Sequence, residues 1–436
     1  MNIKQILEIT KGKPLNVSNL STEVSSFTID SRKKQKNSFF VPLKGSKFDG
    51  HLFIEDSLKN GSVGFFTEKP VVFKNGILVE NNLKALTQVG IYKRNKLSKA
   101  IAITGTSGKT TVKELLSFLL KNFFPTYSTS GNYNNEIGVP LTLANIPENT
   151  RIGVFELGAG KIGDITYLSQ MVRQDISVLT SVGHGHTEKF GSYENVLKGK
   201  GEIFDFSQFA VLPEQLKNFY RKKLKKYITF GENGDISYKN VYVSEYGTSG
   251  EIFYKNEKIK ITVPVYNRAV FKNIAAVAGV LYFLDINPLK HLKLFEEFSP
   301  PKGRGNIIKN GNLTIIDDTY NANPLSVENA IKTISSIKGK KIIVLGDMLE
   351  LGEYSEKLHR EVGKLLRESP IDYLFFYGEK MKFAFEEAGR GKWFSKKEEI
   401  AKEIKNISSK EKVFVLVKGS RGMKMEDVIC SISDSL

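Results

Sequence analysis

A glycine-rich segment that ends in lysine and threonine carries the clearest chemistry in this sequence. It reads Gly105-Thr106-Ser107-Gly108-Lys109-Thr110-Thr111 and follows an apolar run at 100–104. Glycines let backbone N–H groups point inward, the lysine pairs with β- and γ-phosphates, and the helix start adds positive potential. Thr110 is placed to bind Mg²⁺. The segment therefore predicts a loop that holds the phosphates of ATP.

The match to the general phosphate-loop pattern is incomplete. That pattern has a glycine five residues before Gly108, where this sequence has Ile103, and the glycine that is present is Gly105. A glycine-rich turn without a ligand is the alternative interpretation. The flanking strand and helix, together with the Lys-Thr-Thr ending, favour the nucleotide loop.

A doubly wound α/β unit must position this loop. The strand Ala100–Thr104 precedes it, and a helix follows, since Val112, Leu115, Leu116, Leu119 and Phe123 share one helical face. Continuous apolar strands spaced by helical segments predict a parallel sheet covered on both faces. Further strands are expected at 152–157, 176–181, 209–212 and 227–230, and an antiparallel hairpin is expected within 240–265 around a turn at 255–257.

The segments on either side predict two more domains. Short apolar runs at 38–43 and 62–66, separated by turn residues, predict a small mixed α/β domain over 1–99. The central ATP-binding domain is expected over 100–302, where a linker at 299–305 follows it. Residues 303–436 alternate strands and helices again and predict a Rossmann-like domain. Its strands are expected at 313–316, 341–345, 373–377 and 413–417, and its helices at 326–337, 355–367 and 397–407.

Composition limits the compartment and the partners. The 436 residues include one cysteine, Cys430, which excludes an intrachain disulfide and favours a reducing cytosol. The start of the chain lacks the apolar core of a signal peptide, and no apolar run approaches the ~20 residues of a membrane span. We expect a cytoplasmic monomer without membrane insertion.

The net charge of +17 has three interpretations. It fits nucleic-acid binding, polyanionic small substrates such as nucleotides and UDP-sugars, or a lysine-rich surface that keeps the protein in solution. Because the positive residues are spread along the chain, the sequence favours the last two, and we expect no nucleic-acid partner.

Several further segments carry a family resemblance. They are Gly131–Pro140, Glu156–Gly160, His184–Ser192 and Lys200–Ile203. With the glycine-rich loop, they resemble the Mur ligases and folylpolyglutamate synthases. The resemblance implies amide formation driven by ATP, in which a carboxylate becomes an acyl phosphate that an amine attacks. Such an enzyme must neutralise crowded negative charge, align two substrates and exclude water.

Segments nearer the two ends resemble one subgroup of that family. Asp317–Pro324, Leu345–Glu353 with His359, and Val417–Met423 are similar to the ligases that join D-alanyl-D-alanine to UDP-N-acetylmuramoyl-tripeptide. Asp30–Arg32 and Gly45–His51 resemble the UDP-binding segments. Two alternatives stay open: a sister ligase that adds the third amino acid, and a basic P-loop NTPase that binds nucleic acid.

The resemblance implies a role for each matching residue. The implied catalytic residues are Lys109, Glu156, His186 and Lys200, with Lys200 carbamylated, and the implied ligands of Mg²⁺ are Thr110, Glu156, His186 and carbamylated Lys200. The implied ATP contacts are Gly105, Thr106, Ser107, Gly108, Lys109, Thr110, Thr111, Asn273, Arg304 and Asp318. The implied UDP contacts are Ser31, Arg32, Gly45, Asp49 and His51. The implied dipeptide region holds Asn321, Asn323, Asp347, Lys418, Ser420 and Arg421.

Residue types alone also allow plainer interpretations. Lys200 is then a solvated lysine beside Lys198, and His186 is a core or surface histidine. Glu202 is then a charge on a helix surface, and Asp318 forms an Asx-turn. Asn321 and Asn323 are equally typical of turn chemistry at a strand end.

Two positions depart from the family pattern. Ser181 stands where the family usually has asparagine, and Ala269 stands where a histidine usually precedes Asn273 by four residues. The adenine contacts near Asn273 are therefore the least determined part of the expected site.

Overall fold

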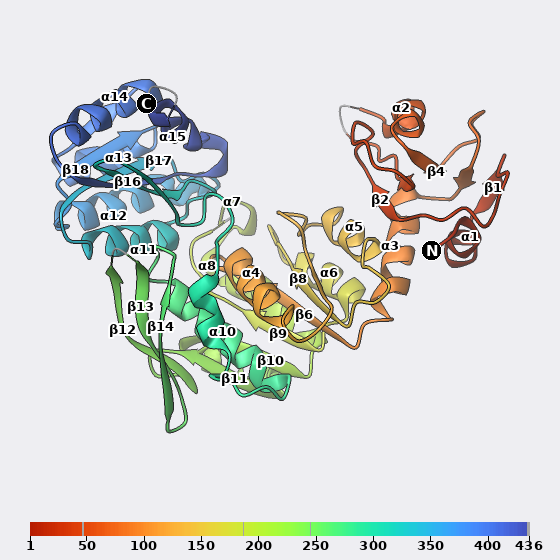
Figure 1. Cartoon of the computed structure of the whole chain (residues 1–436), viewed down its shortest axis with the longest axis horizontal. Coiled ribbons are helices and arrows are strands. Elements are labelled where there is room, and N and C mark those ends of the chain that lie inside the picture. The colour runs from red at the N-terminus through yellow and green to blue at the C-terminus, as the bar shows by residue number, and fades with distance from the viewer. Residues whose placement is uncertain (46–47, 186, 245, 434–436) are drawn as a thin grey trace. The chain divides into compact units, whose positions relative to one another are not determined.

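The computed structural model describes residues 1–45, 48–185, 187–244 and 246–433, which form three β-sheets with helices (Figure 1). Parallel strand pairs predominate in all three, which confirms the predicted α/β fold class. The chain divides into two compact units. The first unit comprises 1–102, 120–158 and 164–175, and the second comprises 103–119, 159–163 and 176–436. The expected domain limits at 99 and 302 stay predictions.

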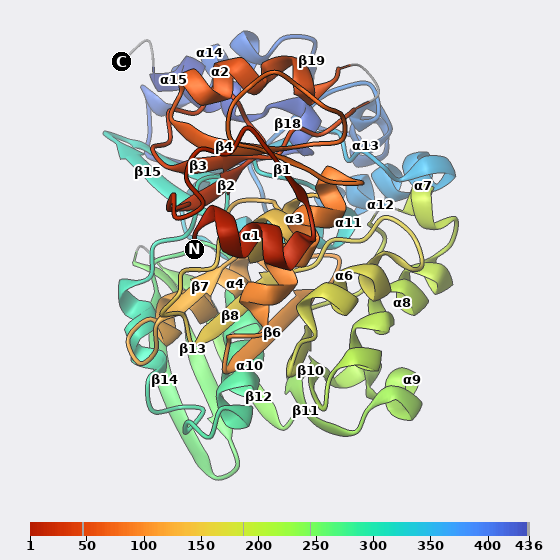
Figure 2. The ribbon, with the colours of Figure 1, turned by 90° about the vertical axis from the view of Figure 1, so that its right-hand side faces the viewer.

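The N-terminal sheet has five strands in the order β1-β5-β4-β3-β2, and only the β1–β5 pair is antiparallel. Phe39 and Phe40 are consecutive in β3 and therefore point to opposite faces. Phe39 joins the core under α1 and α3, whereas Phe40 packs with Ile54 of α2; Figure 2 shows these helices on the two sides of the sheet. The bounds are α1 Ile3–Thr10, β1 Lys13–Leu15, β2 Ser26–Thr28, β3 Ser38–Phe40, α2 Ile54–Lys59, β4 Ser62–Thr67, β5 Gly76–Leu78 and α3 Asn82–Arg94.

The second sheet has nine strands in the order β14-β13-β12-β11-β10-β9-β6-β8-β7. Its apolar strands fall where the sequence predicts them. The hairpin is confirmed as β13 and β14 around a turn at 255–256, and a further strand, β12, extends it to three antiparallel strands. The strand bounds are β6 Lys99–Thr104, β7 Thr126–Ser128, β8 Ile152–Glu156, β9 Ile176–Leu179, β10 Phe209–Pro213, β11 Lys226–Gly231, β12 Ile236–Ser244, β13 Gly247–Tyr254 and β14 Glu257–Val263.

Helix α4 follows the glycine-rich loop as predicted and buries Val112, Leu115, Leu116 and Leu119 completely. The prediction is wrong for Phe123, because the helix ends at Leu120 and Phe123 is exposed. The helix bounds around this sheet are α4 Lys109–Leu120, α5 Gly138–Ala144, α6 Asp164–Val172, α7 Thr187–Phe190, α8 Tyr193–Gly201, α9 Lys217–Tyr220 and α10 Val270–Phe283.

The C-terminal sheet has six strands in the order β15-β16-β20-β17-β18-β19, and only the β15–β16 pair is antiparallel. Each face has its own core, one under α11, α12 and α13 and the other under α14 and α15 (Figure 1). This two-sided cover confirms the predicted Rossmann-like architecture. The bounds are β15 Asn306–Asn310, β16 Leu313–Asp318, α11 Pro324–Ser335, β17 Lys340–Gly346, α12 Ser355–Arg367, β18 Tyr373–Tyr377, α13 Met381–Ala388, β19 Lys392–Phe394, α14 Lys397–Ser408, β20 Val413–Lys418 and α15 Glu426–Ser433.

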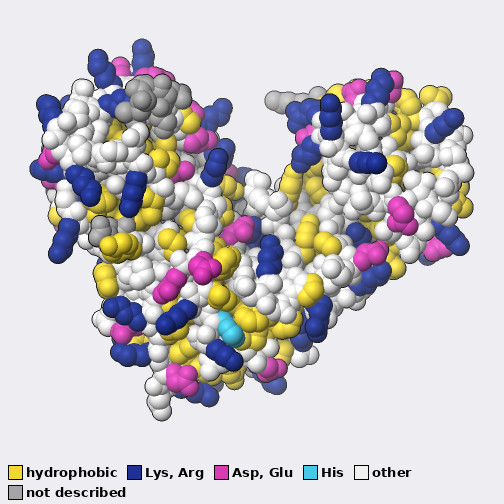
Figure 3. Space-filling model, in the orientation of Figure 1, with side chains coloured by type: hydrophobic (Ala, Val, Ile, Leu, Met, Phe, Trp, Pro, Cys, Tyr) yellow, Lys and Arg dark blue, Asp and Glu magenta, His cyan; other side chains and the backbone are white. Residues whose placement is uncertain are grey.

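The surface charges intermingle. On the face drawn in Figure 3, lysine and arginine side chains are scattered among aspartates and glutamates. Within the described ranges, no helix is long and apolar enough to span a membrane.

Candidate active site

The glycine-rich loop joins the end of β6 to the start of α4. Gly105 has φ +146°, and a Cβ there would lie 2.1 Å from Thr180 Oγ1, so only glycine fits. Gly108 also has a positive φ, of +88°. The Nζ atom of Lys109 donates to the carbonyl oxygen of Gly105 at 2.6 Å. The side chain thus folds back over the loop, where a phosphate-binding lysine is expected.

The segment after β9 fixes the conformation of this loop. Ser181 Oγ accepts a hydrogen bond from the Ser107 N–H at 3.0 Å and donates to the Ser107 carbonyl at 2.9 Å. The Thr106 N–H donates to the Ser181 carbonyl oxygen at 2.9 Å. One hydroxyl therefore contacts both backbone groups of Ser107.

Two residues that were expected to contact ATP lie outside the loop in sequence but contact it in the structure. A Cβ on Gly108 would lie 2.7 Å from Asn273 Oδ1, so this α10 side chain lies directly against the loop. Arg304 Nη2 donates to Thr110 Oγ1 at 3.2 Å, although the two residues are 194 positions apart. The Arg304 guanidinium also stacks 3.8 Å above the ring centre of Tyr320. Its Nε is buried and has no hydrogen-bond partner among the described residues.

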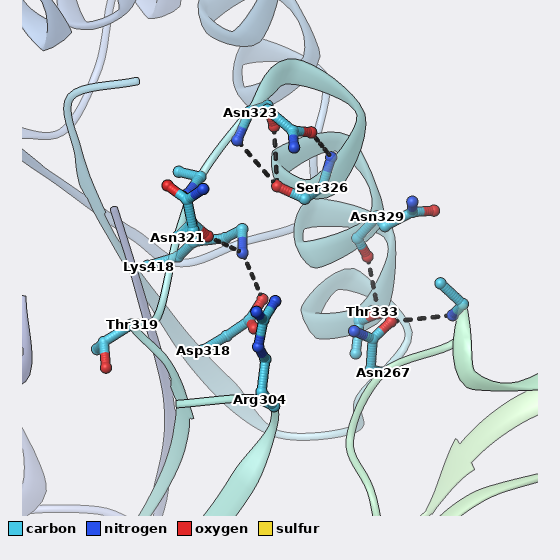
Figure 4. A network of polar contacts seen from close by, with 12 residues as sticks. Asn267, Arg304, Asp318, Thr319, Asn321, Asn323, Ser326, Asn329, Thr333 and Lys418 are labelled. Atoms are coloured by element: carbon cyan, nitrogen blue, oxygen red, sulfur yellow. Dashed lines mark hydrogen bonds and ion pairs between the residues drawn. The ribbon is translucent and has the colours of Figure 1, made fainter. Parts of the chain in front are cut away.

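Asp318 forms a buried ion pair rather than the alternative Asx-turn. Its carboxylate lies 2.7 Å from Lys418 Nζ, which also donates to the Asn321 carbonyl oxygen at 2.8 Å (Figure 4). Lys418 is 3% exposed and Asp318 14%. The Asx-turn belongs to Asp317, whose Oδ1 accepts hydrogen bonds from the N–H and hydroxyl of Thr319.

Asn323 caps helix α11. Its Oδ1 accepts from the Ser326 N–H at 2.9 Å, and Ser326 Oγ accepts from the Asn323 N–H at 3.0 Å (Figure 4). This reciprocal capping box, with Pro324 at the first helical position, is a local arrangement. The turn-chemistry interpretation thus accounts for the contacts of Asn323, whereas Asn321 Oδ1 accepts from the N–H of Ala322 at 2.9 Å and lies 3.4 Å from the N of Arg421.

The other expected dipeptide residues differ in their surroundings. Asp347 is buried, and its Oδ1 accepts from the Met381 N–H at 2.8 Å, at the start of α13. Burial raises the pKa of Asp347, while hydrogen bonds from the α13 backbone oppose that shift. Ser420 Oγ accepts from the Leu349 N–H at 2.8 Å. Arg421 is exposed and pairs with Glu426.

His359 supports the same segment from within the core. Its Nε2 accepts from the Met348 N–H at 3.1 Å, and its Nδ1–H donates to the Ser355 carbonyl oxygen at 2.7 Å. Burial lowers the pKa of His359 below its ordinary value. The ring is therefore a neutral group, and both of its nitrogens are hydrogen-bonded.

Lys200 is buried at the end of α8, so its interpretation as a solvated lysine is wrong. It is 1% exposed, and its Nζ donates to the Ala159 carbonyl oxygen at 3.2 Å. Glu202 is also buried, which excludes the surface-charge interpretation, and its carboxylate accepts from the Gly163 N–H at 2.7 Å. Lys200 and Glu202 thus hold the two ends of one loop, 159–163. Sequence reasoning set Glu202 aside, although it belongs to the Lys-Gly-Glu motif.

Glu156 is buried at the end of β8, in the first unit. Its Oε1 accepts from Asn134 Nδ2 at 2.8 Å. Asn134 lies in the Gly131–Pro140 motif, and its own role was missed from sequence. Lys109, Thr110 and Lys200 belong to the second unit, and His186 lies outside the described residues. Among the residues with a described placement, no three His, Cys, Asp or Glu side chains gather as a metal site.

The expected UDP residues form two local pairs. Arg32 is 88% exposed and donates to Asp30 at 2.9 Å, which lowers the pKa of Asp30. His51 is partly buried, with Nδ1 2.6 Å from Asp49 Oδ1 and Nε2 accepting from Asn82 Nδ2 at 3.2 Å. The backbone and side chain of His51 lower the pKa of Asp49.

The Asp49–His51 contact joins residues two positions apart, and the contact with Asn82 ties His51 to the start of α3. The Gly45 N–H donates to the Phe48 carbonyl oxygen at 2.9 Å. Ser31 is partly buried, and its carbonyl oxygen accepts from Asn60 Nδ2 at 2.9 Å.

Comparison with known proteins identifies the class. A model of the Mur ligase middle domain matches residues 103–281, and a model of the Mur ligase glutamate ligase domain matches residues 303–421. The chain belongs to the Mur ligase family.

Within that family, the similarity points to one kind of enzyme. The UDP-N-acetylmuramoyl-tripeptide–D-alanyl-D-alanine ligase of Bacillus subtilis is 34% identical over 99% of this chain and 98% of its own length. MurF from Acinetobacter baumannii superposes with a TM-score of 0.91 at 30% identity, covering 99% of this chain and 98% of that one. MurF ligase from Thermotoga maritima, solved with ADP, gives a TM-score of 0.84 at 30% identity, covering 94% and 97%.

Proposed function

We propose that this chain is an ATP-dependent ligase that joins D-alanyl-D-alanine to UDP-N-acetylmuramoyl-tripeptide. The contact between Arg304 and Thr110 carries the proposal most directly. It brings a cation from the C-terminal α/β part to the first turn of the phosphate-loop helix. The buried Nε of Arg304, which has no partner among the residues with a described placement, is a donor suited to a phosphate oxygen. Lys109 supplies a second positive charge from the loop itself.

The reaction requires that a carboxylate be activated before an amine can attack it. Transfer of the γ-phosphoryl group of ATP to the terminal carboxylate of the tripeptide gives an acyl phosphate and ADP. The amine of D-alanyl-D-alanine then displaces phosphate and forms the amide. Lys109 and Arg304 stabilise the negative charge that develops in the first step. The proximity of Asn273 to Gly108 supports its proposed role as a nucleotide contact.

Mg²⁺ is the cofactor that we propose beside ATP. The ion prefers oxygen ligands, and the Thr110 hydroxyl and the Glu156 carboxylate are such groups. When bound, it neutralises phosphate charge. His186 and carbamylated Lys200 are our proposed ligands for a second ion. A lysine that is 1% exposed suits this role, because carbamylation replaces a buried cation with an anion.

We assign each substrate to a different part of the chain. We propose residues 1–99 for the UDP group, with Arg32 exposed at the surface beside Asp30 as the cation for its pyrophosphate, residues 100–302 for ATP, and residues 303–436 for the dipeptide. Around the dipeptide, the Lys418–Asp318 pair and Ser420 are positioned at the ends of β16 and β20, where ligands bind in open α/β sheets.

Substrate choice tests the proposal. The purified chain is offered ATP and Mg²⁺ with either UDP-tripeptide and D-alanyl-D-alanine or UDP-dipeptide and single amino acids, and products are identified by mass. We expect the pentapeptide product from the first mixture alone. Product from the second mixture alone would identify the sister ligase that adds the third amino acid.

A further inference from the structure

Contacts among three rings connect the central and C-terminal parts of the second unit. The His184 ring contacts both Tyr193 and Tyr354: it is stacked on Tyr193 at 5.1 Å between ring centres and 30°, and tilted against Tyr354 at 5.9 Å and 47°. Both separations are within the range of attractive aromatic pairs. Among the described residues, the buried Nδ1 of His184 has no hydrogen-bond partner. Ring contacts therefore hold this side chain.

Two hydrogen bonds and a close backbone approach accompany these ring contacts. The Glu188 N–H donates to the Glu350 carbonyl oxygen at 3.4 Å, and Thr187 Oγ1 donates to the Leu351 carbonyl oxygen, also at 3.4 Å. A Cβ on Gly352 would lie 3.1 Å from Glu188 Cα, at a φ of +58°. Glycine at this position thus permits the close approach of helix α7 to the segment 349–354.

Tyr193 and Tyr354 each lie in a segment that is connected to residues of the candidate site. Tyr193 is the first residue of α8, and Lys200 lies seven residues later on the same helical face. On the other side, Tyr354 packs against the C-terminal core. The segment that carries Tyr354 is tied to Ser420 through the Leu349 N–H.

We propose that His184, Tyr193 and Tyr354 form an aromatic latch that positions the Lys200 helix against the dipeptide-binding segment. The proposal rests on the proposed function, since it assigns the latch to alignment of the dipeptide amine with the activated carboxylate. The three are positioning residues, because alignment and not chemistry depends on them. The phosphate loop makes its own contacts with Ser181, so ATP binding does not require the latch.

The test compares Tyr354→Ala with Tyr354→Phe in the full chain. Tyr167→Ala removes an exposed tyrosine from α6 and is the matched control. We expect Tyr354→Ala to speed hydrogen exchange of the Glu188 amide by about two- to tenfold, the range for loss of one aromatic pair. We also expect lower kcat and higher KM for D-alanyl-D-alanine with unchanged KM for ATP. Tyr354→Phe keeps the ring and should restore both readouts.

Other outcomes separate the latch from the function. Equal exchange at Glu188 in the wild type and Tyr354→Ala would overturn the latch, as would equal defects in Tyr354→Ala and Tyr354→Phe. If Tyr354→Ala speeds exchange at Glu188 as expected but the wild-type chain has no ligase activity, the result would support the latch and contradict the proposed function. If Tyr354→Ala does not fold, Tyr193→Ala removes the other tyrosine that contacts His184 and must give the same result.

Discussion

Lys198 and Lys200 lie two residues apart on helix α8, but their surroundings differ completely. Lys198 is exposed, whereas Lys200 is buried against the Ala159 carbonyl oxygen and the Phe190 ring. A buried lysine is costly unless its charge is compensated or changed. Burial therefore makes Lys200 the lysine of this helix that is suited to a special chemical role.

Lys200→Ala should lower kcat at least about 100-fold, because an anion at this position would help to stabilise the developing charge. A short-chain carboxylate such as acetate should restore part of the activity without bicarbonate. Lys198→Ala is the matched control and should retain near-normal turnover. Near-normal turnover of Lys200→Ala would show that no carbamate is needed.

His359 links one residue to the stability of the C-terminal core. Burial lowers the pKa of His359 in the folded chain. Below about pH 6.5, His359 therefore binds a proton more readily in the unfolded chain than in the folded chain. This group therefore makes the folded state less stable as pH falls through the ordinary histidine range. The charged groups that face it are Asp347, which raises its pKa, and Lys380, which lowers it.

His359→Gln should flatten this dependence. Its free energy of unfolding should change less between pH 7.5 and pH 5.5 than that of the wild type, in which one histidine contributes a slope of at most about 1.4 kcal/mol per pH unit. Urea titrations at both pH values measure the difference. An unchanged wild-type slope in the variant would show that His359 does not titrate differently on folding.

At the scale of the element, helix α11 depends on the cap at Asn323. Asn323→Ala should cost about 1 kcal/mol of stability, because the Ser326 N–H loses its acceptor. Asn323→Ser keeps an acceptor and should retain both stability and KM for the dipeptide. Denaturant midpoints and steady-state kinetics check this. A raised dipeptide KM in the stable serine variant would assign Asn323 to substrate binding instead.

Elements with strong periodicity could be predicted from the sequence. Helix α12 has the expected bounds, Ser355–Arg367, because its apolar residues repeat at helical spacing and are buried on one face. Phe123 fits the α4 pattern but lies beyond the end of the helix, since periodicity alone does not define a terminus. Strand β12 was not expected as a third antiparallel strand.

Contacts between distant residues could not be predicted in this way. The pair of Asp318 with Lys418 joins positions 100 residues apart, and Arg304 reaches Thr110 across 194. Neither pattern nor composition fixes such distances, because they depend on how β16, β20 and α4 pack. The cap at Asn323, in contrast, is a local pattern that the Asn-Pro-Leu-Ser sequence already contains.

At the scale of the whole molecule, one chain must bring three substrates into a single reaction. The full-length similarity to UDP-N-acetylmuramoyl-tripeptide–D-alanyl-D-alanine ligases and the Arg304–Thr110 contact support the same account, in which ATP is consumed only when a carboxylate and an amine are present. Closure around the substrates would also protect the acyl phosphate from water. The central prediction is thus that ATP is consumed only when both other substrates are bound.

Release of ADP and phosphate tests this claim most directly. The purified, folded chain is assayed with ATP, UDP-N-acetylmuramoyl-tripeptide, D-alanyl-D-alanine and Mg²⁺, and then with each component left out in turn. We predict sustained, stoichiometric release of ADP and phosphate in the complete mixture, and a loss of at least about 100-fold when any one component is missing. Sustained release that continues without the UDP-tripeptide or without D-alanyl-D-alanine would contradict the account.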